Sequence, residues 1–515
     1  MRISFSRTSI LTLLLFLLLF LGPTCNASSR FVVAGAQSSN PFMSPNSTYV
    51  IKGIVDLGGQ EVRIPQSCTI KFKRNGKLVN GTLNGVETKL KNPRTGCIGV
   101  IMKGTWNVPI IKDSYFDCQV LSDNQIFDNI SQMQSDEVSN RVQLTKPTYR
   151  LILDKKHKIG LSLKSNTELS NGSVITIAGN DLPQYTIISV ARNNIKISGG
   201  EIVGDVGQHQ YIEGSTSQWG FGISINKATN VTVSDIKLSK CTGDGIYIGG
   251  GKGKFVGDCS EASKNIVVKN VLSDDNRRQG ISITYADGVW IENCTFSNTG
   301  KTESVSPGCG MDIEPNDGQS VKNVTVKNCR FVNNNKILDV SIGGYQTDGD
   351  KCNVERVQLE KCYITGPLSI RTGSVVLRDC DMATLSIHLA KMPKDKVLIE
   401  SCKIHGGSGV TIRSVGKTTD AMYMPVYTFK SCSLDMDQVL TKGMFSKINH
   451  KGDEVAEFNV EDCIISMPEG TQKYDVIQAN NTCTFRFSKC EINARGRSVN
   501  LKDKSFSNCR LSEKK

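Results

Sequence analysis

Two carboxylates near the middle of the chain, Asp312 and Glu314, have a spacing that suits acid–base chemistry. Their surroundings alternate apolar with small or polar residues, which predicts a short β-strand. Residues i and i+2 of a strand point to the same face, with Cα atoms roughly 6.5–7 Å apart. Glycosidic bonds are cleaved by pairs of carboxyl groups, which lie about 6.5–9.5 Å apart in enzymes that invert the anomeric configuration. We therefore take both residues as catalytic candidates, with Glu314 favoured as the acid because free glutamic acid has the higher pKa.

The acid pair lies in the last of four similar phrases. These are Gly-Ile-Ser-Ile from Gly222, Gly-Ile-Tyr-Ile from Gly245, Gly-Ile-Ser-Ile from Gly280 and Gly-Met-Asp-Ile from Gly310. If the four strands stack in parallel as successive coils, their Ile residues form a continuous core. The alternate residues then form a surface stripe, made of Ser224, Tyr247, Ser282 and Asp312.

Asp244 precedes the second phrase and is the third catalytic candidate. Coils of a stacked solenoid lie about 4.8 Å apart, so two coils separate Asp244 from Asp312 by roughly 9–10 Å along the axis. Other side chains near the stripe are expected to bind the sugar: Trp219, Tyr247, Arg277, Arg278, Gln279 and Asn316. In the alternative interpretation, Asp312 and Glu314 are ordinary solvated strand residues, or they pair with Arg277 and Arg278 on the coil before.

Residues 1–27 have the pattern of an export signal. Two arginines precede an apolar run that is too short for a transmembrane helix, and no second spanning segment follows. We expect an exported protein, located in the periplasm, on the cell surface or outside the cell. A lipid anchor at Cys25 is an alternative, although the residues before it match a lipoprotein signal poorly.

The chain of 515 residues carries a formal net charge of +13. A basic excess on an exported protein suggests an acidic partner, such as a uronate or sulfated polysaccharide. Lysine and arginine are spread along the whole chain instead of forming one cluster, so we expect no nucleic-acid partner. We also expect a monomer.

The 18 cysteines present two alternatives, disulfides or free thiols. Nine of them occupy one fixed place in a repeated strand–turn formula: Cys294, Cys329, Cys362, Cys380, Cys402, Cys432, Cys463, Cys490 and Cys509. This regularity favours a stacked column of buried free thiols. The lack of Cys-x-x-Cys pairs and the presence of only five histidines argue against a metal site built from these residues.

The order of patterns predicts an all-β chain with one short helix. We expect a flexible leader at 28–46, an N-terminal β-rich cap at 47–120 and a β-solenoid at 121–510. Apolar residues at helical spacing behind Ser122 and Asp123 predict a helix that ends near Met133.

These repeats resemble the right-handed parallel β-helix of the pectate-lyase-like superfamily, and locally its polygalacturonase branch. That branch carries Asn-Thr-Asp, Gly-Asp-Asp, Gly-His-Gly and Arg-x-Lys on four successive coils. The corresponding places here read Trp219-Gly-Phe221, Gly243-Asp244-Gly245, Arg278-Gln279-Gly280 and Asp312-Ile313-Glu314. Asp244 keeps a family carboxylate, Gln279 replaces the histidine, and two acids replace the cationic pair. The resemblance implies the fold and a glycan-directed activity, whereas these replacements weigh against polygalacturonase chemistry.

Three functions follow as hypotheses. The first is an inverting glycoside hydrolase that acts on a polysaccharide through Asp244, Asp312 and Glu314, without a cofactor. The second is a β-elimination lyase that uses Arg277, Arg278 and Tyr247, for which the acid pair offers oxygen ligands to Ca²⁺. The third is a non-catalytic glycan-binding or adhesive β-helix, in which Trp219 stacks on a sugar ring.

Overall fold

The computed structural model divides the chain into two compact units: Met1–Val108 with Ser114–Leu121, and Pro109–Asp113 with Ser122–Lys515. We describe each unit by itself. The residues that the structure describes are 29–36, 39–250, 261–301, 305–316, 318–335, 338–343, 353–371, 373–389, 396–406, 409–414, 425–435, 443–448, 456–467, 475–478, 483–493, 495 and 506–512. The expected export signal at 1–27, with Cys25, lies outside these residues.

The first unit contains a six-stranded sheet. Its strands are β1 (Arg30–Ala36), β2 (Thr48–Asp56), β3 (Glu61–Arg63), β4 (Thr69–Phe72), β5 (Lys77–Lys91) and β6 (Ile98–Asn107). The expectation of a flexible leader at 28–46 is wrong for Arg30–Ala36, which pairs in parallel with β2. The apolar start of β1 explains this, because Val33 is buried and the Phe31 ring stacks on Tyr49 at 5.3 Å.

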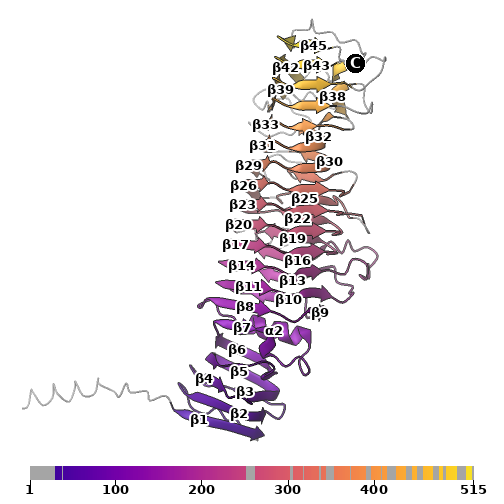
Figure 1. Cartoon of the computed structure of the whole chain (residues 1–515). Coiled ribbons are helices and arrows are strands. Elements are labelled where there is room, and N and C mark those ends of the chain that lie inside the picture. The colour runs from indigo at the N-terminus through magenta and orange to yellow at the C-terminus, as the bar shows by residue number, and fades with distance from the viewer. Residues whose placement is uncertain are drawn as a thin grey trace, which may run out of the picture. The chain divides into compact units, whose positions relative to one another are not determined.

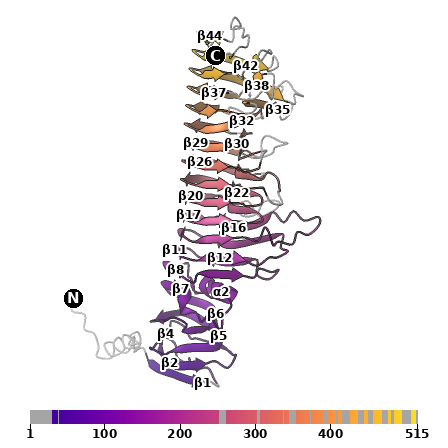
Figure 2. The ribbon, with the colours of Figure 1, turned by 45° about the vertical axis from the view of Figure 1, so that its right-hand side comes forward.

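The second unit is a parallel β-helix, in which most coils contribute three short strands (Figures 1 and 2). A 15-stranded sheet forms one column and includes β17 (Thr229–Ser234), β20 (Ser263–Lys269), β23 (Ala286–Glu292) and β26 (Ser320–Lys327). A 24-stranded sheet forms the other two. One of these includes β15 (Glu201–Val203), β18 (Lys237–Ser239), β21 (Leu272–Asp274), β24 (Thr295–Ser297) and β27 (Arg330–Val332). The expected all-β solenoid is therefore confirmed.

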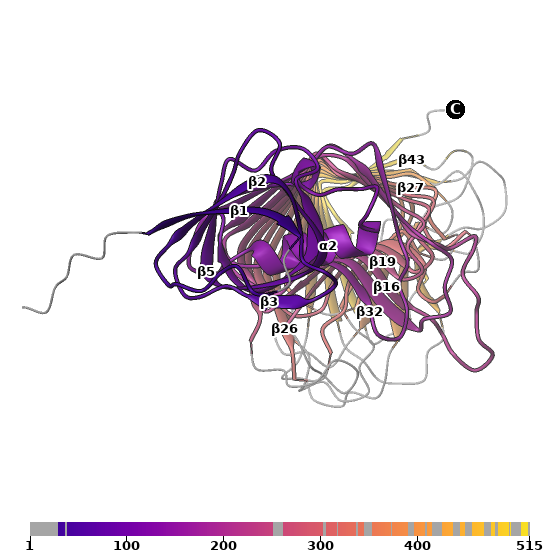
Figure 3. The ribbon, with the colours of Figure 1, turned by 90° about the horizontal axis from the view of Figure 1, so that it is seen from below.

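The third column carries the four glycine-led phrases. Its central strands are β13 (Gln184–Val190), β16 (Trp219–Asn226), β19 (Asp244–Gly249), β22 (Gln279–Ile283), β25 (Cys309–Ile313) and β28 (Val340–Ile342). Figure 3, a view along the stack, shows β16, β19 and β32 (Asp381–Leu389) of this sheet behind one another. Ile223, Ile246, Ile281 and Met311 are register partners, and all four are fully buried. The predicted continuous core is thus confirmed.

The cysteine column follows a regular turn between the first two columns. Every described cysteine is a free thiol, and the members of the column from Cys294 to Cys490 are buried. The residue before each column cysteine has a positive φ, as at Asn293 (55°) and Asn328 (53°), which asparagine tolerates better than most residues. The prediction of buried free thiols is confirmed for these residues, whereas Cys509, the last member of the column, is a free thiol that is only half-buried.

The one predicted α-helix is confirmed as α2 (Asp123–Met133). Ser122 caps its N-terminus, since the Ser122 hydroxyl accepts from the Gln125 amide while the Gln125 side chain accepts from the Ser122 amide. Its buried face packs against β9 (Thr148–Leu151) and β10 (Ile159–Leu163), with Phe127 against Tyr149. Within the described ranges, no helix has the length and apolarity needed to cross a membrane.

Candidate active site

The residues that alternate with the core isoleucines form a single column across the coils. In register order these are Ser224, Tyr247, Ser282, Asp312 and Ser341. The sequence pattern predicted this alignment, including the two steps between the strands of Asp244 and Asp312. It also predicted a surface stripe, which is wrong because all five residues are buried and Asp312 is only 2% exposed.

The column is covered partly by the side chains that precede each glycine. Gln279 donates from Nε2 to Asp312 Oδ2 at 2.5 Å, and Ser282 donates from Oγ to Asp244 Oδ2 at 2.5 Å. Gln279 and Ser282, on either side of Gly280, thus each reach an acid of a neighbouring coil. A Cβ at Gly280 would lie 2.6 Å from the Gly310 carbonyl oxygen, which leaves no room for a larger residue.

Arg278 links the acids of neighbouring coils. Its Nη1 lies 3.3 Å from both carboxylate oxygens of Asp244 and donates to Gln279 Oε1 at 3.0 Å. Its Nη2 lies 3.7 Å from Glu314 Oε2. The alternative interpretation, in which the acids pair with both arginines, is therefore confirmed for Arg278 with Glu314. The buried Nε of Arg278 has no hydrogen-bond partner among the described residues.

Asp312 is the acid whose environment most favours a proton. Burial raises its pKa well above the ordinary value, and the neighbouring Glu314 raises it further through charge and a hydrogen bond. Arg278 and Ser341 oppose this rise without cancelling it. Burial also raises the pKa of Asp244, against the opposing effects of Arg278 and Ser282. The site therefore places a buried carboxyl with a raised pKa beside Glu314, whose side chain is 34% exposed.

The other predicted binding residues lie outside these contacts. Tyr247 is buried, stacks on Phe221 with ring centroids 4.7 Å apart and shares a hydrogen bond with Thr284 at 2.9 Å, so it does not offer a free face to a sugar. Trp219 is half-buried at the start of β16, opposite Gln184. Asn316 bonds to Gln319 in the turn that leads into β26.

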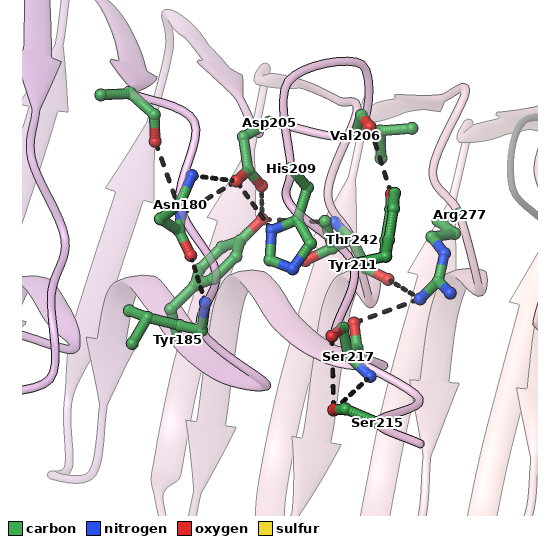
Figure 4. Close-up of polar contacts among 12 residues, drawn as sticks. Asn180, Tyr185, Asp205, Val206, His209, Tyr211, Ser215, Ser217, Thr242 and Arg277 are labelled. Carbon is green, nitrogen blue, oxygen red and sulfur yellow. Dashed lines mark hydrogen bonds and ion pairs between the residues drawn. The ribbon is translucent and has the colours of Figure 1, made fainter. Parts of the chain in front are cut away.

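Arg277 takes a different direction from Arg278. Its Nη1 donates to the carbonyl oxygens of Thr216 and Ser217 at 2.8 and 3.2 Å, and its guanidinium lies over the Tyr211 ring at 4.4 Å (Figure 4). Both arginines lie in the bend before β22, and each is drawn to partners on a different part of the fold. Arg277 thus holds the loop between β15 and β16, and the expectation that it lies beside the acid pair is not supported.

A second polar network in the same loop escaped the sequence reasoning. His209 Nδ1 lies 2.9 Å from Asp205 Oδ2, and both side chains are completely buried (Figure 4). Tyr185 donates to Asp205 Oδ1 at 2.7 Å, and Asn180 donates from Nδ2 to Oδ2 at 2.9 Å. The scarcity of histidine was the available signal, but the donors Asn180 and Tyr185 reach Asp205 from the preceding coil, which no local motif records.

Among the residues that the structure describes, no group of three or more His, Cys, Asp or Glu side chains is arranged to hold a metal ion. The buried acids Asp244 and Asp312 instead accept hydrogen bonds from Arg278, Gln279 and Ser282.

Comparison with known proteins gives one family match and partial relatives. Residues 155–336 and 260–422 match the family model described as right handed beta helix region, so the matches together span more than half of the chain. The expected right-handed parallel β-helix is therefore confirmed.

The uncharacterized protein YclG of Bacillus subtilis (strain 168) is 35% identical over 162 residues, which are 30% of this chain and 28% of that protein. The SPbeta prophage-derived protein YorA of the same strain is 28% identical over 190 residues, 34% of this chain and 32% of that protein. The chain thus spans about a third of the length of these curated relatives.

Three solved structures illustrate the general likeness. The tailspike gp49 of Acinetobacter baumannii bacteriophage Fri1, a capsular polysaccharide depolymerase, has a TM-score of 0.41 at 15% identity, over 78% of this chain and 63% of that one. The catalytic domain of a GH87 α-1,3-glucanase has a TM-score of 0.40 at 14% sequence identity, over 76% of this chain and 66% of that one. The A-module of the Azotobacter vinelandii mannuronan C-5 epimerase AlgE4 has a TM-score of 0.41 at 12% sequence identity, over 72% of this chain and 91% of that one. Likeness at this level says nothing about activity.

Proposed function

Because the chain belongs to the right-handed β-helix family, we propose that its coils present a glycan-cleaving site, and that the protein is a glycoside hydrolase acting on a polysaccharide. The observation that carries the proposal is the carboxyl pair of Asp312 and Glu314. Asp312 is buried and has a raised pKa, whereas Glu314 is partly exposed and paired with Arg278. Acid catalysis at neutral pH needs such a pair, in which the environment keeps one carboxyl protonated and the other ionised.

The two acids take complementary roles in this proposal. In the proposed step, the proton of the pair passes from the buried Asp312 to Glu314, which lies at the solvent side and delivers it to the glycosidic oxygen. The bond between the anomeric carbon and that oxygen breaks, and the leaving sugar departs as an alcohol. Water adds to the anomeric carbon, and its proton returns to the pair through solvent. The expectation that used the pKa of free glutamic acid is replaced by this relay, because burial raises the pKa of Asp312.

Asp244 serves this site as a positioning residue. Its side chain is fully buried and its oxygens accept from Arg278 and Ser282, so it is not placed to touch a sugar. Through Arg278 it fixes the orientation of Glu314. A retaining hydrolase needs a free carboxylate nucleophile about 5–5.5 Å from the acid. Asp244 is not free, which favours direct attack by water and inversion of the anomeric configuration.

The test is an assay of the purified protein on a panel of neutral, uronate and sulfated polysaccharides. New reducing ends and the ultraviolet absorbance of unsaturated products are followed together, and the anomeric form of the first product is recorded by proton NMR. Hydrolysis with inversion is expected. Absorbance from unsaturated ends would replace the hydrolase with a lyase, and glycan binding without either signal would leave a binding protein.

A further inference from the structure

The charges around the acid pair have a consequence for the substrate. The cluster holds the three carboxyls of Asp244, Asp312 and Glu314 and the single guanidinium of Arg278. Three acidic groups thus share one cationic group, so the cluster offers a bound sugar more acceptors than cationic donors and becomes net negative as its carboxyls ionise.

Arg278 is already engaged by these acids. Its Nη1 contacts Asp244 and Gln279, its Nη2 contacts Glu314, and its side chain is only 15% exposed. The surrounding acids raise the pKa of Arg278, so it remains a cation at any working pH. Recognition of a sugar carboxylate or sulfate uses the donor fork of an arginine or a lysine ammonium. At this site, the guanidinium of Arg278 is directed at the protein's own acids, Asp244 and Glu314.

Arg277 does not replace Arg278 as a donor to an acidic sugar. Its guanidinium donates to the carbonyls of Thr216 and Ser217 and lies over Tyr211, and the residue is only 7% exposed. Both arginines that the sequence offered for gripping an acidic sugar are therefore committed to contacts within the protein.

We infer that the sugar unit bound against Glu314 is uncharged, such as a neutral hexose or an N-acetylhexosamine, and that a uronate or sulfated sugar is rejected there. This inference rests on the proposed function and specifies its substrate. It departs from the expectation of an acidic polymer, which used the net charge of +13 of the whole chain. Charges beyond about 8–10 Å are screened in physiological salt, so the carboxylates in direct contact decide the preference in the reacting subsite.

The net negative charge also suits the proposed chemistry. Glycoside cleavage develops positive charge on the sugar ring in the transition state. The carboxylates of Glu314 and, behind it, Asp244 stabilise that charge. A neutral ring gains this attraction in the transition state without repulsion in the ground state, whereas a uronate carries its own negative charge into the same place.

The experiment compares matched polymers that differ only in charge. Each uronate polysaccharide of the panel is assayed beside the same polymer after chemical reduction of its carboxyl groups to primary alcohols, with natural neutral glycans alongside. We expect cleavage of a neutral or carboxyl-reduced polymer at least about 100-fold faster than of its charged parent, as repulsion between unit charges a few ångströms apart predicts. Faster cleavage of a charged parent would overturn the inference and leave the hydrolase standing.

A binding arm separates this inference from the hydrolase itself. Affinity electrophoresis of Asp312→Asn in gels containing each polymer reports binding without turnover. We expect retardation by a neutral polymer, and a gain of about 10-fold or more in affinity for the charged parent when Glu314→Gln is added. Retardation by neutral polymers without wild-type cleavage would overturn the hydrolase and keep the inference. Retardation by charged polymers alone, unaffected by Glu314→Gln, would overturn the inference.

Discussion

Arg278 on one coil contacts both carboxylate oxygens of Asp244 on the coil before it, at 3.3 Å each. The same guanidinium reaches Glu314 on the coil after it, at 3.7 Å. One cation thus joins acids that are 70 residues apart in the chain, from Asp244 to Glu314. Each of these residues lies where its strand begins or ends, so the stacking of coils is what brings them together.

Removal of Arg278 is expected to destabilise the fold. Arg278→Met leaves Asp244 buried without its cation, at a cost of about 3–5 kcal/mol in the free energy of unfolding. The double variant Arg278→Met with Asp244→Asn should recover much of that loss, because no buried charge is left unpaired. Urea unfolding measures both values.

Arg378→Met is the matched control. Arg378 pairs with Glu400 at 2.9 Å, but its side chain is 42% exposed, and an exposed pair contributes only about 0–1 kcal/mol. Equal losses for the two arginine variants, or no recovery in the double variant, would contradict a buried ion pair at Asp244.

The raised pKa of Asp312 predicts a specific dependence of stability on pH. A carboxyl whose pKa is higher in the folded state holds its proton there and loses it on unfolding. Its contribution to stability is complete below the ordinary pKa of about 4 and is lost as pH rises toward the folded-state value. Asp312→Asn removes this dependence. The variant should gain stability relative to the wild type between pH 4 and pH 8, and parallel pH profiles would contradict the raised pKa.

The sequence was sufficient for the features that repeat. Alternation in each phrase predicted the buried isoleucine column and the register of Ser282 with Asp312. The fixed place of cysteine in the repeated strand–turn formula predicted the free-thiol column around Cys329. It was insufficient wherever side chains from different coils meet. Whether Tyr247 is covered depends on Phe221 of another coil, and no local pattern records that contact.

The divergence of the two arginines has the same cause. Arg277 and Arg278 are consecutive residues of the same type, and no local pattern separates their roles. Their partners, the Thr216 carbonyl and the Asp244 carboxylate, become neighbours only once the coils are closed. The buried pair of Asp205 and His209 was missed for the same reason, since its donors Tyr185 and Asn180 come from the preceding coil.

The network around Asp205 is expected to stabilise the loop that carries it. Tyr185→Phe removes the hydroxyl that donates to Asp205 Oδ1 and accepts from the Thr242 amide, so both buried groups lose this hydrogen bond. The expected loss is about 1–3 kcal/mol in the free energy of unfolding. The control is Tyr363→Phe, because Tyr363 is 36% exposed and its hydroxyl can be hydrated. A loss no larger than that of the control would contradict the role of this hydrogen bond.

The cysteine column predicts two classes of thiol. Cys118 is exposed and should react with a maleimide in the folded protein within minutes, whereas buried members such as Cys329 should react only after denaturation. Peptide mass spectrometry after denaturation without a reductant should find the column cysteines singly labelled. Column peptides that label only after reduction would show disulfides in place of free thiols.

The central claim is that Asp312 and Glu314 cleave a glycosidic bond, and the most direct measurement is reducing-end release by the wild type, Asp312→Asn and Glu314→Gln. The control is Glu168→Gln, an exposed glutamate on strand β11 (Thr167–Asn171). We expect both site variants to lose at least about 100-fold in rate while the control keeps wild-type activity, and the wild-type rate to fall as rising pH removes the proton from the pair. Wild-type rates in both site variants would contradict the account.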